Sequence, residues 1–371
     1  TLKKHKPERQ TVPNKPNELA ILTVNGRSYQ DWESVAVHHR MRETPPFICR
    51  FTCSEGTPIA SNLTKMQIRP GDVCTVTLAG QPAFRGKVTT RQVYLDAHRH
   101  HIEIQAATLL EVNTSSVISQ TMEWKDQTFS QIAQNVLGRL GIPLKFEGGM
   151  PPQIKFPRVS ASHGESVYDF LDTLARSLSQ ASGNGIAFTS NVQGDFVVAT
   201  AALPGSDVIE EGRNMLIGRE IIYNAAQAEM NPVISQGSGN DKTWGAAVAS
   251  IPYFSGKNDS PFNASSSPSV IVNEIPTTDN KMLQGRATSE GKWLDGDQIT
   301  VAVTVHGWLK PSGGLWQRNQ IYTINSPSLI MPNERLRSKS VTFTQDDKTG
   351  PRTTLELCND AAIGGDAPPI K

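Results

Sequence analysis

The sequence predicts a mainly β protein with two small β-barrels in one chain and an α+β module inserted between them. Short apolar stretches of alternating polarity recur in both halves of the chain, and 29 glycines and 24 prolines supply turns between them. Between the halves, the alternation gives way to apolar residues at helical spacing. A chain of 371 residues is also too long for one ordinary core, so two or three domains are expected.

These changes of pattern divide the chain into five segments. The N-terminus is basic, rich in proline and poor in apolar residues, which is typical of a flexible arm. Ser, Asn, Gly and Pro dominate from 238 to 278, so we expect an exposed insertion there, over about 238–294. The expected segments are an arm at 1–17, the first barrel at 18–115, the α+β module at 116–204, the second barrel at 205–360 and a flexible tail at 361–371.

The first barrel begins with a strand at 18–24 and a hairpin turn at Asn25-Gly26, the strongest short hairpin signal in the chain. Alternation then resumes as far as Val37. Further strands are expected at 47–53, 72–79, 83–93 and 101–110.

The central module is predicted to contain two helices and a hairpin. Thr128 and Gln131 have the spacing of a capping box, and apolar residues follow at helical spacing as far as Leu140. A second helix of the same pattern is expected from Ser162 to Gly183. The hairpin strands are expected at 185–190 and 195–200.

The second barrel carries the most distinctive motif of the chain, at 306–319. Alternating apolar runs enter and leave it, and Pro311 followed by two glycines has the chemistry of a turn, so a strand-turn-strand hairpin is expected. Trp308 and Trp316 flank the turn, close enough to pack against each other or against the same core. The motif residues are Gly307, Trp308, Gly314, Leu315, Trp316 and Asn319. Other strands are expected at 216–223, 227–237, 337–344 and 353–358.

This motif resembles the second barrel of baseplate hub proteins from Mu-like and P2-like contractile-tailed phages. Two weaker similarities lie in the module, at Trp124-Lys125 ahead of the first helix and at 163–168 where the second begins. The order of parts is similar from about residue 18 to 360. One departure is 106–108, Ala-Ala-Thr in place of the Gly-Arg-Asp often found in that family, so any ion pair of those residues would be absent.

The resemblance implies a structural protein of the tail protein D type, with a hub fold like that of phage T4, no enzymatic activity and no cofactor. Such proteins are expected to form homotrimers, in which two tube-like barrels per chain give a ring of six similar domains. The ring would join a sixfold tail tube to a threefold central spike and template tube assembly. Expected partners are the tube protein or a tube initiator, the spike protein and baseplate wedge proteins, with DNA passing through the lumen without specific binding. The expected location is the virion baseplate, after synthesis in the host cytoplasm.

Composition argues against several other functions. A net charge of +1 predicts no general affinity for nucleic acid or anionic membranes. No run of 18 apolar residues is present, so no membrane anchor is expected, and no signal peptide is recognised. The cysteines are expected to be buried free thiols, with a disulfide or a metal site as the alternative. They are Cys49, Cys53, Cys74 and Cys358.

Three chemical interpretations compete with a purely structural role. His98 and His100 would share a strand face with Asp96, a spacing that can chelate zinc, but a solvated turn is the simpler explanation. Ser166 falls at a helix start and lacks the second glycine of a nucleophile elbow, which disfavours a hydrolase. The first module helix loosely resembles a glycan-binding LysM module, although its apolar residues are explained by a core. The alternative function is therefore a tail-associated protein that binds or degrades peptidoglycan.

Overall fold

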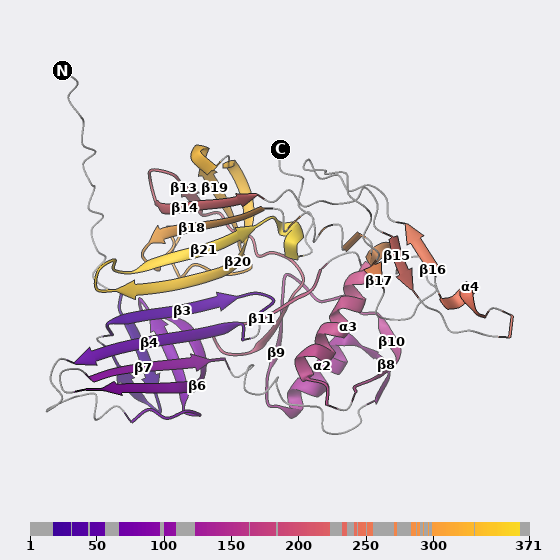
Figure 1. Cartoon of the computed structure of the whole chain (residues 1–371), viewed down its shortest axis with the longest axis horizontal. Coiled ribbons are helices and arrows are strands. Elements are labelled where there is room, and N and C mark those ends of the chain that lie inside the picture. Colours follow the sequence, from indigo (N-terminus) through magenta and orange to yellow (C-terminus); the bar gives the residue numbers. More distant parts are fainter. Residues whose placement is uncertain are drawn as a thin grey trace, which may run out of the picture.

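The computed structural model describes most of the chain between residues 18 and 363. Strands predominate, as the sequence predicts, and form one large sheet and three small ones. Figure 1 shows the large sheet as a stack of strands with the two long helices beside it. The expected arm at 1–17 and residues 364–371 of the expected tail lie outside the described residues. Within 18–363, the gaps are at 31, 44, 56–66, 97–99, 109–122, 163, 183–184, 223–231, 236–240, 243, 250, 255–270, 273–282, 287, 290–291, 293–295, 297–298 and 330.

The large sheet has 13 strands. Its main path runs β14-β18-β21-β20-β3-β4-β7-β6-β5-β1-β2, and β19 joins it through β20 while β13 pairs with β19. The strands of the N-terminal half-sheet are β1 (Ala20–Val24), β2 (Arg27–Tyr29), β3 (Ser34–Arg40), β4 (Phe47–Glu55), β5 (Val73–Leu78), β6 (Gln81–Leu95) and β7 (His100–Ala107). Those of the C-terminal half-sheet are β13 (Val208–Glu210), β14 (Met215–Ile222), β18 (Ile299–His306), β19 (Ile321–Ser326), β20 (Met331–Asp346) and β21 (Arg352–Cys358).

The predicted hairpin between β1 and β2 is confirmed. Asn25 and Gly26 have φ angles of 49° and 78°, and Val24 pairs with Arg27. Positive φ at both central residues matches the twist of the flanking strands, and asparagine and glycine tolerate it best.

The two half-sheets meet in an antiparallel seam between β3 and β20. The seam runs from Arg40 opposite Ser340 to Ser34 opposite Asp346. Val37 and Phe343, which lie opposite each other, are both completely buried, and one apolar core extends across both half-sheets. Within the described residues, the strand pairing does not close on itself to form a barrel. The mainly β class is therefore confirmed, while the two separate barrels stay a prediction.

The central module contains the two expected helices. α2 (Phe129–Arg139) begins at the predicted capping box, in which Thr128 Oγ1 accepts from the Gln131 amide while the Gln131 side chain accepts from the Thr128 amide. α3 (Val167–Ser182) begins later than predicted. Its first turn is capped by Ser166, whose Oγ accepts from the Asp169 amide at 3.0 Å. Ser162, where the helix was expected to start, forms only a turn ahead of it.

Five short strands surround these helices. β8 (Glu123–Thr128) pairs with β10 (Lys155–Ser160), and the predicted hairpin forms as β11 (Ala187–Ser190) and β12 (Phe196–Ala199). β9 (Leu144–Glu147) adds to β12 in parallel, which was not predicted. The module has its own apolar core, separate from that of the large sheet.

The expected insertion is partly structured. β15 (Pro232–Ser235), just before it, pairs with β16 (Ile251–Phe254) and β17 (Ile271–Val272) inside it, and α4 (Ala246–Ala249) precedes β16. The expected insertion therefore contains short strands and a helical turn, and Trp244 in it is 76% exposed. Farther along, Ser289 Oγ donates to Ser179 O of α3 at 3.0 Å, so the insertion returns to the module.

Two 3-10 helices complete the described structure. η2 (Pro327–Leu329) precedes β20, and η3 (Asp360–Ile363) follows β21. Ala361, Ala362 and Ile363 are buried, so packed structure continues three residues into the segment where we expected the tail to begin.

Candidate functional site

The tryptophan motif forms a compact loop between β18 and β19, but these two strands do not pair with each other. β18 lies between β14 and β21, whereas β19 lies between β13 and β20. The expected strand-turn-strand hairpin is therefore wrong for the flanking strands. A smaller hairpin exists inside the loop, where Leu309 bridges to Leu315 and the Lys310 amide donates to Gly314 O at 2.9 Å. Gly314 has a φ of 75°, a left-handed conformation that glycine adopts without strain.

Both tryptophans are buried in the core of the large sheet, which agrees with the second of the two expected packing arrangements. Trp308 Nε1 donates to Thr344 O on β20 at 3.1 Å, and the Trp308 amide donates to Glu18 Oε1 at 3.0 Å. Trp316 packs against Tyr322 with ring centroids 5.2 Å apart, and its Nε1 has no hydrogen-bond partner in the part of the chain that the structure describes. The loop is therefore fixed by buried aromatic surface together with hydrogen bonds, which include those from the Ser312 amide and hydroxyl to the Asp207 carboxylate at 3.0 and 2.7 Å.

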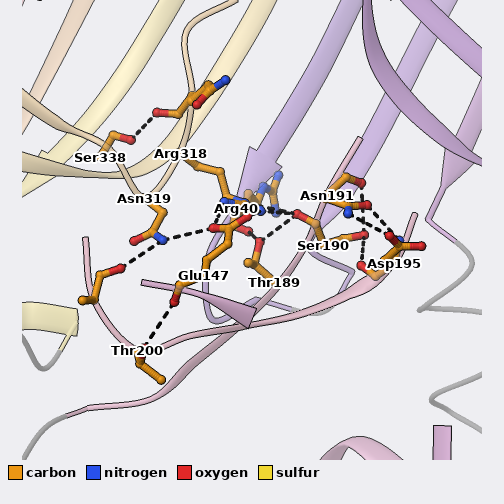
Figure 2. A network of polar contacts seen from close by, with 12 residues as sticks. Arg40, Glu147, Thr189, Ser190, Asn191, Asp195, Thr200, Arg318, Asn319 and Ser338 are labelled. Atoms are coloured by element: carbon orange, nitrogen blue, oxygen red, sulfur yellow. Dashed lines mark hydrogen bonds and ion pairs between the residues drawn. The ribbon is translucent and has the colours of Figure 1, made fainter. Parts of the chain in front are cut away.

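Directly after the second tryptophan, the chain enters a buried polar junction (Figure 2). Arg318 makes a two-pronged ion pair with Glu147 at the end of β9, through Nη1 to Oε2 at 2.8 Å and Nη2 to Oε1 at 3.0 Å. The Arg318 guanidinium also donates from Nε to Ser190 O of β11 at 3.1 Å. One side chain of the C-terminal half-sheet thus holds two strands of the module.

Asn319 extends the junction toward β20. Its Nδ2 donates to Glu147 Oε2 at 3.1 Å, and its Oδ1 accepts from Nε of Arg337 at 2.9 Å. Arg337 in turn pairs with Asp360 of η3 at 2.8 Å. Asn319 has a φ of 63°, and asparagine is one of the few residues other than glycine that occupy this region readily. Asn319 therefore links two buried arginines: it bonds directly to Arg337, and it shares the Glu147 carboxylate with Arg318.

The electrostatics of the junction follow from burial and pairing. Burial acts to raise the pKa of Glu147, but the charge and hydrogen bonds of Arg318 outweigh it and hold this pKa below its ordinary value. Burial lowers the pKa of Arg337, and the neighbouring Asp360 carboxylate opposes that effect. Removing one partner of such a pair would leave a buried charge without compensation.

The β11–β12 hairpin of the module is inserted where the two half-sheets meet. Thr189 Oγ1 donates to Arg40 O at the end of β3 at 2.7 Å, which ties the module to the N-terminal half-sheet. In the turn, Asn191 Oδ1 accepts from the Asp195 amide at 2.9 Å, and a Cβ built on Gly194 would lie 3.1 Å from Arg85 O of β6. Figure 2 shows the Thr189–Arg40 and Asn191–Asp195 contacts beside the Arg318–Glu147 pair. Both half-sheets and the module therefore meet at this hairpin.

A pocket of about 290 Å³ lies beside the junction, on the side of β3 and β4. His39 stacks on Phe47 with ring centroids 3.9 Å apart, and the Arg318 guanidinium lies 5.5 Å from the centre of the same Phe47 ring. Burial lowers the pKa of His39 to about 3, and His39 Nε2 lies 2.7 Å from Ala83 O. A neutral imidazole that donates to this carbonyl satisfies both observations. The remaining lining residues are Gln81, Pro82, Glu147, Asn191, Val192, Leu203, Gly314, Leu315, Trp316 and Gln317.

The competing chemical interpretations find little support in the described residues. His98, the centre of the expected metal alternative, lies outside them, and no group of three or more His, Cys, Asp or Glu side chains in the described part could hold a metal ion. All four cysteines are buried, and none forms a disulfide, as expected. Ser166 caps a helix. None of the helices described is long and apolar enough to cross a membrane.

Comparison with known proteins agrees with the resemblance seen in the motif. Residues 20–106 match the family described as "Mu phage baseplate assembly protein GpP-like, N-terminal", and residues 110–200 match "Baseplate hub protein gp44-like, second domain". The baseplate hub protein gp44 of Escherichia phage Mu is 23% identical over 350 residues, which cover 92% of this chain and 88% of that protein. The chain is similar to the Mu-type baseplate hub proteins.

Solved structures of a phage tail protein and a secretion-system protein share this fold. The 43 kDa tail protein of prophage MuSo2 from Shewanella oneidensis superimposes with a TM-score of 0.77 at 20% identity, covering 93% of this chain and all of that one. The E. coli c3393 protein, a type VI secretion component described as structurally similar to the T4 tail proteins gp27 and gp5, matches with a TM-score of 0.55 at 11% identity. That match covers 94% of this chain and 79% of c3393.

Of the junction residues, the sequence identified Asn319 but not Arg318, Glu147 or Arg337. Only a weak sequence signal pointed to a polar junction here. Arg318 and Asn319 follow the tryptophan motif directly, but their carboxylate partner lies 171 residues earlier, at the end of an unremarkable four-residue strand.

Proposed function

We propose that this chain is the baseplate hub of a contractile phage tail, a non-enzymatic homotrimer that joins the sixfold tail tube to the threefold central spike. The observation that supports it best is the β3–β20 seam, which places two half-sheets edge to edge in one chain. Three copies would present six comparable units around an axis, and such a ring can meet a sixfold partner on one face and a threefold partner on the other.

The proposed division of labour follows the three parts of the chain. The half-sheets within 18–115 and 205–360 act as the tube-like units and template the first layer of tube protein. The module at 116–204 is fixed by the Arg318–Glu147 junction, so it moves as one body with the ring. The 238–294 insertion and the two chain ends are the candidate contacts for wedge proteins, and DNA passes through the lumen without specific binding. The complex acts in the virion after synthesis in the host cytoplasm.

Light scattering tests the trimer directly. One chain has a mass of 40.4 kDa, so the purified protein is expected at about 121 kDa, and negative-stain images should show a ring with a central hole and a sixfold outline. A chain that stays at 40.4 kDa even with tube and spike proteins added would overturn the proposal. Peptidoglycan pull-down and zymography would then test the cell-wall alternative.

A further inference from the structure

Seven antiparallel pairings join eight strands into one continuous run across the molecule. The run is β14-β18-β21-β20-β3-β4-β7-β6, and every neighbouring pair in it is antiparallel. Figure 1 shows these strands stacked, with β14 near the top of the sheet and β6 at its bottom. The two ends of this run are the places where the sheet could continue into another chain.

At one end, the second half of β6 has an unpaired edge among the described residues. β5 leaves β6 at the pair of Val73 with Lys87, and the backbone of Val88 bonds to the turn at 71–72. Beyond that point β6 pairs with β7 alone. Thr89–Leu95 are all exposed, and this stretch includes Val93, Tyr94 (58% exposed) and Leu95 (64% exposed).

At the other end, among the described residues, β14 forms a ladder with β18 alone, and only Met215 at its start bridges to Glu211 as well. Leu216, Ile217 and Ile222 on it are exposed. Glu220 lies opposite the completely buried Val301, which places its carboxylate on the core face of the sheet. Its Oε1 is buried without a hydrogen-bond partner among the described residues, and burial raises the pKa of this carboxyl group. A buried carboxylate oxygen without a partner calls for a physical explanation, and here it lies on a strand that also exposes three apolar side chains.

The two free edges have complementary side chains. Arg91 on β6 is exposed and makes no ion pair with any described residue. It lies on the same core face as Glu220 because it pairs with the buried Ile104. If Arg91 stands opposite Glu220 in an antiparallel pairing, Tyr94 falls opposite Ile217. The same register places Val93 opposite Gly218 and Leu95 beside the bulge at Leu216. One register thus pairs the charges and covers the exposed apolar groups together.

The direction of the strands also fits. In an antiparallel run of eight strands, the first and last strands point in opposite directions. A rotation about an axis nearly parallel to the strands preserves direction, so β6 of the next copy arrives antiparallel to β14. The two edges differ from each other, which makes the contact head-to-tail, and head-to-tail contacts close into rings.

We propose that the second half of β6 (89–95) in one copy of this chain pairs with β14 of the next copy, with Arg91 opposite Glu220, so that the sheet continues around the ring. The assignment rests on the proposed homotrimer and names the surfaces that build it. The β3–β20 seam inside the chain and the β6–β14 seam between chains would then alternate around the ring.

Charge reversal tests the pairing. Arg91→Glu and Glu220→Arg are each expected to shift the protein from trimer to monomer in light scattering, at concentrations where the unchanged chain is trimeric. The double variant R91E/E220R is expected to restore the trimer because the pair is re-formed with its charges exchanged. Arg27→Glu, an exposed arginine on β2, is the matched control and should leave the mass unchanged.

Engineered cysteines test the register and the head-to-tail geometry. Tyr94→Cys combined with Ile217→Cys in one chain should give covalent trimers on oxidation, because the four native cysteines are buried. Either single variant alone should give no cross-link, and a mixture of the two single variants should give covalent dimers at most. Cross-linked dimers from one single variant alone would indicate a two-fold contact and overturn the assignment.

The outcomes separate this inference from the trimer itself. If the unchanged chain is trimeric but double charge reversal fails to restore assembly and no covalent trimer forms, the edge assignment is wrong while the trimer stands. If the unchanged chain is monomeric with tube and spike present, both fail.

Discussion

The inner junction and the outer edges of this protein contrast in how completely their polar groups are satisfied. At the junction, Arg318 and Asn319 are buried and both bond to Glu147. At the edges, Arg91 is exposed and Glu220 keeps a buried oxygen without a partner. The difference indicates which contacts the chain completes by itself and which it leaves for another molecule.

The largest expected effect is at the junction. Glu147→Ala leaves the Arg318 guanidinium buried without its carboxylate and should lower the free energy of unfolding by about 3–5 kcal/mol. Urea denaturation measures it. The matched control is Glu210→Ala, which removes the partner of the 80% exposed Arg213 and should cost less than about 1 kcal/mol. Equal losses in the two variants would mean that the junction contributes no more than a surface pair.

The next effect depends on pH. His39 has its pKa lowered to about 3 by burial, so below pH 6.5 the unfolded chain binds a proton that the folded chain does not. Its contribution to stability should therefore fall by about 1.4 kcal/mol for each pH unit from 6.5 down toward 3. The free energy of unfolding, measured at several pH values, should fall more steeply toward low pH in the unchanged chain than in His39→Phe. An equal pH dependence in the two proteins would show that His39 also takes up a proton in the folded state.

A smaller difference should separate the two tryptophans. Trp308→Phe loses the hydrogen bond to Thr344 O, whereas Trp316→Phe removes an N–H that has no partner. Both variants lose buried ring area, so the informative quantity is the difference, expected at about 1 kcal/mol in favour of Trp316→Phe. Thermal unfolding of both variants in the same buffer measures it, and a reversed order would contradict the hydrogen-bond assignment.

The smallest effect on stability is expected at the free edge. Leu95→Ala should change the unfolding free energy of the dissociated chain by no more than about 0.5 kcal/mol, because this side chain is 64% exposed. Leu336→Ala, at a position 1% exposed, should cost about 2–5 kcal/mol. A large loss from Leu95→Ala in dilute, dissociated protein would show that the edge is packed within one chain.

The same contrast explains what the sequence could predict. The Asn25-Gly26 turn and the Thr128–Gln131 capping box were recognised because their chemistry is complete within four residues. The start of α3 was misplaced because Ser162 and Ser166 both precede an acidic residue at capping distance, and only the second one caps the helix.

Long-range pairing was beyond local patterns. In the sequence, β18 and β19 resemble the two strands of one hairpin, yet each pairs with other strands instead. The Arg318–Glu147 pair spans 171 residues, and nothing in either segment alone specifies the other. The tryptophan motif identified the correct neighbourhood, since Asn319 belongs to both the motif and the junction.

The β3–β20 seam has a consequence for the timing of synthesis. His38 and Thr342 are bonded across it, although 304 residues separate them. While the ribosome is still making the chain, β3 has no strand on that side until β20 emerges near the end. Contacts of such long sequence separation form late and slowly. A truncated product would therefore keep an open β3 edge and lack the strand that connects its two half-sheets, so under the proposed function only a full-length chain would supply both units of the ring.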